Sequence, residues 1–231
     1  MKTTGTNPDI EIIYEDNHLL AVSKPRGLLS QEDYSGKPDL LNLCKEYLIR
    51  EYNKPGDAFL GLLHRLDKPV SGVMLFAKTS KAAARISEQI RQRTVKKIYL
   101  AIVEGSAPKN GMLTHYLKKQ KNTNFTEVVS PQTKGAKRAE LMYDRLEKNG
   151  DFSLLRITLI TGRPHQIRVQ LAKEGLPIFG DRKYGSGKNK HIALHAGALI
   201  VKHPVLKKEV ILTSKPPSVF PWTLFDYSKI R

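Results

Sequence analysis

The sequence predicts an α+β fold with a mixed, mostly antiparallel sheet. Apolar runs of strand length recur along the chain, and a Lys-Asn-Gly-Asp turn separates two long ones, as in a β-hairpin. About three other segments carry apolar residues at helical spacing. No repeat or linker interrupts this pattern, so we expect a single domain at residues 9–231 after a flexible tail at residues 1–8.

The first elements expected are two strands and a helix. Residues 10–27 contain two apolar runs around the turn sequence Glu-Asp-Asn-His, and Lys24-Pro25 ends the second run. Residues 39–52 carry apolar side chains at helical spacing. Asp39 stands at their start, where its carboxylate can accept from free N–H groups, so it is the expected N-cap.

A strand, a helix and another strand are expected next. Residues 71–78 form a continuous apolar run, which is typical of a buried strand. Residues 79–95 return to helical spacing, with Thr79 or Ser80 as the cap. Residues 96–105 are again strand-like and end in a glycine.

The second half of the chain is expected to hold more strands. Residues 106–135 are rich in lysine and turn-forming residues, and no strand is assigned to them. Residues 136–162 predict a long hairpin, and residues 163–175 predict a helix with Gly175 past its end. Two further short strands are expected within residues 191–204 and 208–217.

The charge balance points to a polyanionic partner. The 231 residues include 39 Lys and Arg against 22 Asp and Glu, which gives a formal net charge of +17. An excess of this size is typical of proteins that bind nucleic acid. A solubility adaptation and an acidic protein partner are the alternatives, and we weigh nucleic acid ahead of both.

The composition argues against several other classes of protein. The single cysteine, Cys44, excludes an intramolecular disulfide and fits a reducing compartment. The N-terminus lacks a signal core, and no stretch approaches the roughly 18 apolar residues of a membrane span, so we expect a cytoplasmic protein. Zinc-ligand spacing, a phosphate-binding loop and a dinucleotide motif are also missing from the sequence.

Asp67 is the first candidate for catalysis. This strongly basic chain places it between Arg65 and Lys68, just ahead of an apolar run. Alternate side chains of an extended segment share a face, so Arg65 and Asp67 are expected on one side. A guanidinium favours the ionised carboxylate, which a catalyst acting on RNA needs against the phosphate charges. A carboxylate that only caps the turn before Pro69 fits the same motif equally well.

A second candidate region is residues 161–172, where a predicted strand passes into a helix. Arg163, His165 and Arg168 gather there, beside the free N–H groups and the dipole that attract anions to a helix start. The residues alone leave two interpretations open. They form a patch that only contacts phosphate, or Arg168 reaches Asp67 and keeps it charged.

Tyr99 is the third candidate. Within residues 96–105 it faces away from Ile98 and Leu100. A strand tyrosine is commonly half-buried, with its hydroxyl in a hydrogen bond. Alternatively, it stacks on an extruded base and uses its hydroxyl as an acid or base.

The motifs together resemble the RNA pseudouridine synthases of the RluA type, from about residue 9 to 226. The leading motif is HRLDKPVSG at residues 64–72, close to the family pattern H-R-L-D-x-x-T-S-G. Four other stretches match the family in the right order: LLAVSKPRGLLSQ, KKIYLAIVEG with AKRAELMYDRL, GRPHQIRVQLAKEGLPIFGDRKYG, and IALHAGALIVKHP. Five ordered motifs are far more specific than a single H-R-L-D.

The resemblance implies a reaction and a fold. The enzyme would convert specific uridines in rRNA or tRNA to pseudouridine, without a cofactor or a metal. The N1–C1′ bond breaks, the uracil turns over, and C5 bonds to C1′. The sheet would be split into two halves with a central catalytic cleft.

The resemblance also implies roles for individual residues. Asp67 matches the catalytic carboxylate, and attack on the sugar and abstraction of a ribose proton both remain open. Tyr99 matches the tyrosine that packs on the base, and Arg168 matches the arginine that pairs with the aspartate. The substrate-binding residues implied are Arg65, which would fill the space left by the flipped uridine, with His64, Ile167, Arg163 and His165.

The chain departs from the family pattern in places. Val70 and Pro164 stand where threonine is common, and Gln170 replaces a frequent histidine, but no catalytic group is lost. Many relatives carry an N-terminal S4 RNA-binding domain, for which we expect no room here. RNA binding should then rest on the catalytic domain, with lysines of residues 117–121 and 134–138 as candidates. We expect a monomer without a membrane partner.

Two other functions remain open on the sequence alone. A non-catalytic RNA-binding or ribosome-assembly factor on the same fold explains the charge equally well. A glycosidase or nucleotide hydrolase using Asp67 is the other, although glycosidases generally use a pair of carboxylates and no partner for Asp67 is evident.

Overall fold

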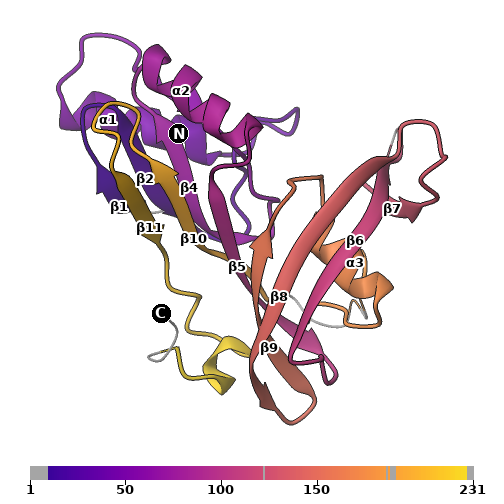
Figure 1. The fold of residues 1–231 in the computed structure, drawn as a ribbon. Coiled ribbons are helices and arrows are strands. Elements are labelled where there is room, and N and C mark those ends of the chain that lie inside the picture. Colours follow the sequence, from indigo (N-terminus) through magenta and orange to yellow (C-terminus); the bar gives the residue numbers. More distant parts are fainter. Residues whose placement is uncertain (1–9, 122, 186, 188–190, 228–231) are drawn as a thin grey trace. The chain divides into compact units, whose positions relative to one another are not determined.

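The computed structural model of the chain describes residues 10–227 apart from residues 122, 186 and 188–190 (Figure 1). It confirms an α+β fold with a mostly antiparallel sheet. The tail expected at residues 1–8 lies outside the described residues. The chain divides into two compact units: unit 1 is Met1–Thr94 with Val201–Ser214, and unit 2 is Val95–Ile200 with Lys215–Arg231.

Unit 1 contains the short strands expected in the first third of the chain. Its strands are β1 (Glu11–Glu15), β2 (Leu19–Lys24), β3 (Gly61–Leu62), β4 (Ser71–Ala77) and β11 (Glu209–Thr213). Strand β2 pairs antiparallel with β1 and with β4, and β3 pairs antiparallel with β4. Every residue of β4 is buried, which confirms the prediction from its continuous apolar run.

The two helices of unit 1 begin where their caps predict. Helix α1 (Leu40–Glu51) starts after Asp39, whose carboxylate accepts from Asn42 N at 3.1 Å. Helix α2 (Ser80–Arg91) starts after Thr79, whose Oγ1 accepts from Ala82 N at 3.2 Å. None of the helices in the described part of the chain is long and apolar enough to cross a membrane.

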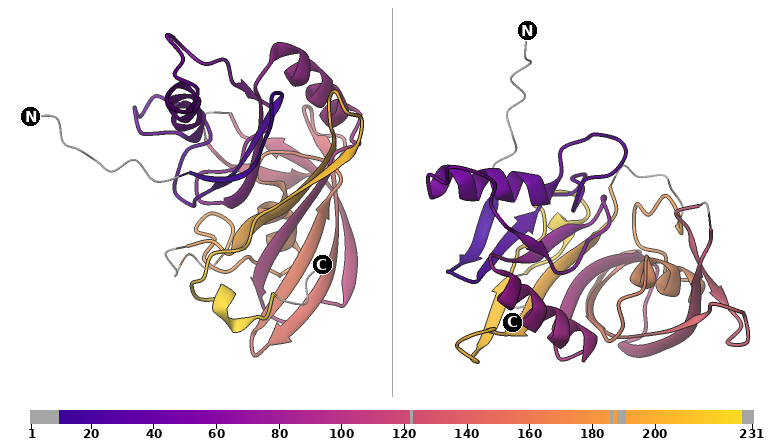
Figure 2. Two further views of the ribbon diagram at one scale, coloured as in Figure 1. Left: turned by 90° about the vertical axis from the view of Figure 1, so that its left-hand side faces the viewer. Right: turned by 90° about the horizontal axis from the view of Figure 1, so that it is seen from above.

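Unit 2 is a curved antiparallel sheet around one helix. Its strands are β5 (Lys96–Glu104), β6 (Asn110–Lys119), β7 (Thr126–Val129), β8 (Lys137–Asn149), β9 (Phe152–Leu159) and most of β10 (Leu194–Lys202). Their order is β10-β5-β9-β8-β6-β7. The strands curve around α3 (Gln166–Lys173), as the view from above shows (Figure 2). Because the sheet encloses this helix, every residue from Gln166 to Leu171 is buried.

Strands β6 and β7 correct the sequence analysis, which assigned no strand to residues 106–135. This segment has few apolar residues at strand spacing among its lysines and turn residues, and in β6 the two buried ones are Leu113 and Leu117. The neighbouring strand supplies what the segment lacks by itself, since Leu113 lies opposite Leu141 of β8. Pairing with a partner strand thus decides a structure that local composition does not favour.

Helix α3 begins later than predicted. The expected helix started at Arg163, but His165 adopts a left-handed conformation with φ 53°, and the helix starts at Gln166. The Gln166 side chain accepts from Arg163 N at 3.0 Å and from Thr161 Oγ1 at 2.8 Å, which stabilises a loop in place of a first helical turn. The predicted end is confirmed, with Gly175 at φ +73° just past the helix.

Candidate active site

Asp67 lies in the loop that leads into β4. It is partly buried, Leu66 before it is buried, and Arg65 is exposed. The main-chain N–H of Val70 donates to Asp67 O at 2.9 Å and closes a turn through Lys68 and Pro69. The turn fixes the backbone on the C-terminal side of the carboxylate.

The residues on either side of Asp67 are held by a segment of unit 1 about forty positions earlier in the chain. Ser30 Oγ donates to Leu66 O at 2.7 Å and accepts from Leu66 N at 3.1 Å. The N–H of Gly27 donates to Lys68 O at 2.8 Å. The backbone that presents Asp67 is therefore anchored both before and after this residue, as a preorganised catalytic group requires.

Lys24 adds a buried cation beneath this loop. Its side chain is fully buried, and Nζ donates to Pro25 O, Leu28 O and Lys68 O at 3.0, 2.8 and 3.2 Å. Burial lowers the pKa of Lys24 to about 7, and the negative charge of Asp67 acts in the opposite direction. Lys24 was not predicted to have a functional role, although a lysine that ends a buried strand ahead of a proline was a visible signal.

Replacing Lys24 by methionine is expected to destabilise the protein and slow its reaction. The apolar stem keeps its packing, but Pro25 O and Leu28 O lose the donor that Lys24 supplies, and each buried acceptor left unsatisfied costs about 1–3 kcal/mol. The loop that carries Asp67 also loses a tether at Lys68 O. Urea unfolding and the turnover rate measure the two effects.

The matched control for this variant is Lys68→Met, which removes an exposed ammonium from the same loop. It should unfold at nearly the same urea concentration as the wild type. If Lys24→Met were as stable as Lys68→Met, the three hydrogen bonds of Lys24 would have no part in holding the loop.

His64 and Arg65 differ in how the structure places them. His64 Nε2 accepts from the main-chain N–H of Leu75 in β4 at 3.0 Å, so one ring nitrogen orients the loop against the sheet. Arg65 is exposed, as a side chain must be if it is to fill the space that a flipped base leaves in the RNA. Substrate binding by either residue stays a prediction.

Arg168 of α3 is held by a carboxylate that the sequence analysis did not pair with it. Its Nε donates to Asp181 Oδ2 at 2.8 Å and its Nη2 to Asp181 Oδ1 at 2.7 Å, a bidentate ion pair in which both side chains are buried. Burial alone would raise the pKa of Asp181. The hydrogen bonds and charge of Arg168, with the N–H groups of Lys183 and Tyr184, outweigh burial and hold that pKa below its usual range.

Tyr184 links this ion pair to His165. The Arg168 guanidinium lies over the Tyr184 ring, 5.3 Å from its centroid, and the Tyr184 hydroxyl lies 2.7 Å from His165 Nδ1. The same hydroxyl accepts from Thr126 N of β7 at 2.8 Å. Burial raises the pKa of Tyr184, so it stays a neutral hydrogen-bonding group at the base of α3.

The other residues predicted around α3 have separate surroundings. Arg163 Nε donates to Arg138 O at 3.1 Å at the end of the sheet, and Ile167 is buried with 5% of its surface exposed. Gln170, which replaces the family's frequent histidine, is fully buried, and its Nε2 donates to Leu113 O and Ala139 O. The side chain of Gln170 therefore joins α3 to β6 and β8 by hydrogen bonds.

Tyr99 lies on β5, where it is partly buried opposite Ile157 of β9. Lys97 is two residues earlier and so shares its face. Among the described residues no carboxylate pairs with Lys97, and burial lowers its pKa. A side-chain carbon added at Gly162 would come 3.8 Å from Lys97 Nζ, so this ammonium lies beside the loop that precedes α3. It is a second cation that the sequence analysis did not single out.

The structure describes the predicted catalytic residues within separate units. Asp67 belongs to unit 1, and Tyr99 and Arg168 belong to unit 2. Their assembly into one site, and the predicted contact of Arg168 with Asp67, stay predictions. What each unit contributes is a rigid setting: an anchored loop for Asp67 and a buried ion pair for Arg168.

Comparison with known proteins places this geometry in a family. The sequence profile described as RNA pseudouridylate synthase matches residues 18–173, which include Asp67, Tyr99 and Arg168. Ribosomal large subunit pseudouridine synthase C of Rickettsia bellii (strain RML369-C) is 33% identical over 215 residues, 90% of this chain and 69% of that protein. The RNA pseudouridine synthase YhcT of Bacillus subtilis (strain 168) is 32% identical over 216 residues, 91% of this chain and 70% of that protein.

A solved human structure has the same fold. RNA Pseudouridylate Synthase Domain Containing 4 superimposes with a TM-score of 0.77 at 26% sequence identity, covering 93% of this chain and 91% of that chain. The architecture of the sheet and helices is therefore that of pseudouridylate synthases.

Proposed function

The chain belongs to the RNA pseudouridylate synthase family and is an RNA-modifying isomerase, and from this premise we propose that Asp67 is its catalytic carboxylate. The observation that carries the proposal is the double anchoring of the Asp67 loop by Ser30 and Lys24. A loop that only closed a turn would need no such support on both sides.

The reaction exchanges one bond for another within a single nucleotide. The N1–C1′ bond of a uridine breaks, the uracil rotates, C5 bonds to C1′, and the C5 proton is lost while N1 gains one. Asp67 starts this sequence either by attack on the sugar or by removal of a ribose proton. Both routes need an ionised carboxylate and a nucleotide extruded from its stack, since stacked bases shield the glycosidic bond.

Three other residues receive roles in the same proposal. Tyr99 packs on the extruded base and moves a proton with its hydroxyl. Arg168 favours the ionised form of Asp67. Arg65, which is exposed, occupies the space that the base leaves in the RNA.

We take rRNA of the large ribosomal subunit as the favoured substrate, with tRNA as the alternative. The support is the name of the Rickettsia relative, a ribosomal large subunit pseudouridine synthase, together with the net charge of +17. The half-buried ammonium of Lys97 near Tyr99 suits a phosphate of the bound nucleotide. The absence of a possible disulfide fits action in the cytoplasm.

A site-resolved pseudouridine map of total RNA, from cells with and without this gene, tests the function. Pseudouridines are labelled with carbodiimide, and each label then stops reverse transcription at that position. We expect one or a few stops in large-subunit rRNA to vanish in the deletion, to return with the wild-type gene, and to stay absent with Asp67→Asn.

Other outcomes separate the alternatives. If the stops were lost from tRNA, the protein would be a pseudouridine synthase whose substrate is tRNA and not rRNA. An unchanged map, together with no turnover by the purified protein on transcribed rRNA and tRNA, would favour an RNA-binding factor on this fold. Release of free uracil from RNA would favour a hydrolase.

A further inference from the structure

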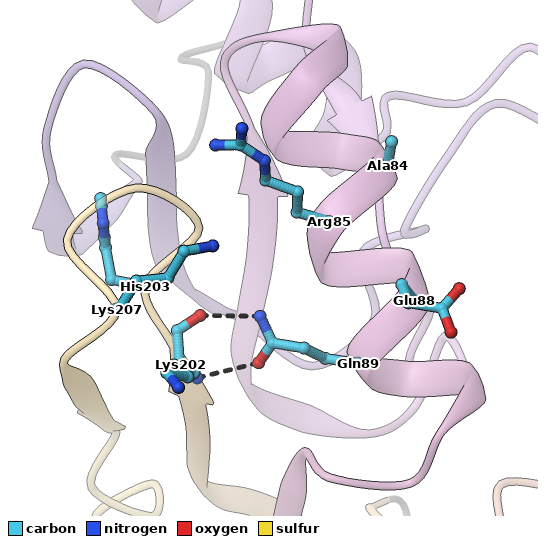
Figure 3. A pocket seen from close by; sticks show the side chains of 7 residues that line it. All are labelled: Ala84, Arg85, Glu88, Gln89, Lys202, His203 and Lys207. Atoms are coloured by element: carbon cyan, nitrogen blue, oxygen red, sulfur yellow. Dashed lines mark hydrogen bonds between the residues drawn. The ribbon is translucent and has the colours of Figure 1, made fainter.

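A groove in unit 1 lies between α2 and the turn that joins β10 to β11, and none of the residues assigned above lines it (Figure 3). Its volume is about 480 Å³. The residues that line it are Ala84, Arg85, Glu88 and Gln89 of α2, Lys202 at the end of β10, and His203 and Lys207 of the turn.

The two walls of the groove are held at a fixed distance by hydrogen bonds. The Gln89 amide donates to Lys202 O at 2.8 Å and accepts from Lys202 N at 2.9 Å, which joins α2 to the end of β10 (Figure 3). The turn itself is rigid, because His203 Nδ1 accepts from Val205 N and Leu206 N at 3.2 and 2.9 Å. His203 Nε2 lies 2.7 Å from Asp16 Oδ2, which fixes the other side of the ring.

The groove concentrates positive charge. Arg85 Nη1 and Lys207 Nζ both donate to Pro204 O, at 3.0 and 3.1 Å, so one carbonyl holds the two cations side by side. Lys202 adds a third exposed cation. Among the described residues no carboxylate forms an ion pair with any of these three side chains.

The one carboxylate in the lining is already neutralised by its own helix. Glu88 forms an ion pair with Arg91 and accepts from Gln92 Nε2 at 2.6 Å. Its carboxylate points away from the β10–β11 turn (Figure 3). Within the described part of the chain the three cations thus have no ion-pair partner, and an external anion would relieve their mutual repulsion.

We propose that this groove binds the phosphodiester backbone of the substrate RNA, outside the target nucleotide. The inference rests on the proposed function for its RNA ligand. The paired cations at Pro204 O suit two oxygens of one phosphate, and Lys202 suits a second phosphate along the groove. The groove has no aromatic side chain other than the fully engaged His203, so it offers no platform for a base. It therefore contributes affinity without sequence preference.

The test compares two triple variants with the same loss of charge. The groove variant is Arg85→Gln with Lys202→Gln and Lys207→Gln, because glutamine can still donate to Pro204 O and preserve the turn. The control variant is Lys37→Gln with Arg50→Gln and Lys54→Gln, three exposed cations of unit 1 outside the groove. Circular dichroism and thermal melting establish that both fold.

Fluorescence anisotropy measures binding of two labelled single-stranded RNAs of about 20 nucleotides and different sequence. We expect the groove variant to lose about tenfold or more in affinity for both RNAs, and its slope of log K against log salt to fall by about 1.4, because two phosphates are no longer neutralised. The control variant should change by less than about threefold. At saturating large-subunit rRNA the groove variant should keep the wild-type kcat with a raised KM.

Three results would overturn the proposal. Equal losses in the two variants would mean that only net charge matters. A loss for one RNA sequence alone would mean base recognition. Tight binding of inorganic phosphate or UMP by the wild type, lost in the groove variant while RNA binding persists, would mean a small-anion site. Since binding is measured apart from turnover, a wild type that binds RNA but makes no pseudouridine would reject the proposed function and leave this test intact.

Discussion

Asp67→Asn is expected to abolish pseudouridine formation while RNA binding and folding survive. Asparagine has nearly the same shape but can neither attack the sugar nor take up a proton as a carboxylate does. Losses of about 10²- to 10⁴-fold follow the removal of a group that transfers a proton in the transition state. The main-chain bond from Val70 N to Asp67 O is unaffected, so the loop should keep its form. The measurement is turnover of purified protein on transcribed large-subunit rRNA, with anisotropy for binding.

Asp57→Asn is the matched control for this experiment. Asp57 is an exposed carboxylate of the same unit, paired with Lys45 at 3.2 Å, and exposed pairs contribute little. Its turnover should equal that of the wild type within about twofold. If Asp67→Asn turned over within about tenfold of the wild-type rate, the carboxylate of Asp67 would take no direct part in the reaction.

Asp181→Asn is expected to cause a large loss of stability. The variant keeps an acceptor for the N–H groups of Lys183 and Tyr184 but removes the negative charge that forms the bidentate ion pair with the buried guanidinium of Arg168. Breaking one side of a buried ion pair costs about 3–5 kcal/mol. Calorimetry should show a fall in melting temperature of roughly 6–20 °C for a protein of this size. Asp144→Asn, which breaks the exposed pair with Arg156, is the control and should change little.

The stabilisation by Asp181 should also depend on pH in a defined window. The folded protein holds the pKa of Asp181 below its usual range, so the unfolded chain binds a proton at higher pH than the folded one. The stability difference between wild type and Asp181→Asn is therefore complete above about pH 4 and disappears as the pH falls through the folded value. A difference that instead declined between neutral and alkaline pH would contradict this assignment.

A double variant separates the structural part of Arg168 from its proposed catalytic part. Replacing a buried ion pair by apolar residues of similar size is often tolerated, so Arg168→Met with Asp181→Leu should recover much of the stability that Asp181→Asn loses. Turnover should stay low, because no guanidinium remains to favour the ionised Asp67. Recovery of both properties would make Arg168 a purely structural residue.

Much of the fold was accessible from the sequence because the signals are local. The run at residues 71–78, the caps Asp39 and Thr79, and the turn between β8 and β9 act through neighbouring residues, and each prediction was confirmed. The errors were also of one kind. Strand β6 and the late start of α3 depend on partners that are distant in the sequence, namely Leu141 opposite Leu113 and Glu140 O, which accepts from the Gln166 side chain.

The sequence by itself determined the chemistry that the chain can offer: a lone carboxylate in HRLDKPVSG, a strand tyrosine, an arginine on α3 and an excess of positive charge. Only the tertiary structure decided what supports these groups. Ser30 and Lys24 anchor the Asp67 loop, Asp181 neutralises Arg168, and Gln89 joins the walls of the basic groove. The physical reason is that hydrogen bonds and ion pairs reach only about 3 Å, so their partners are chosen by folding and not by position along the chain.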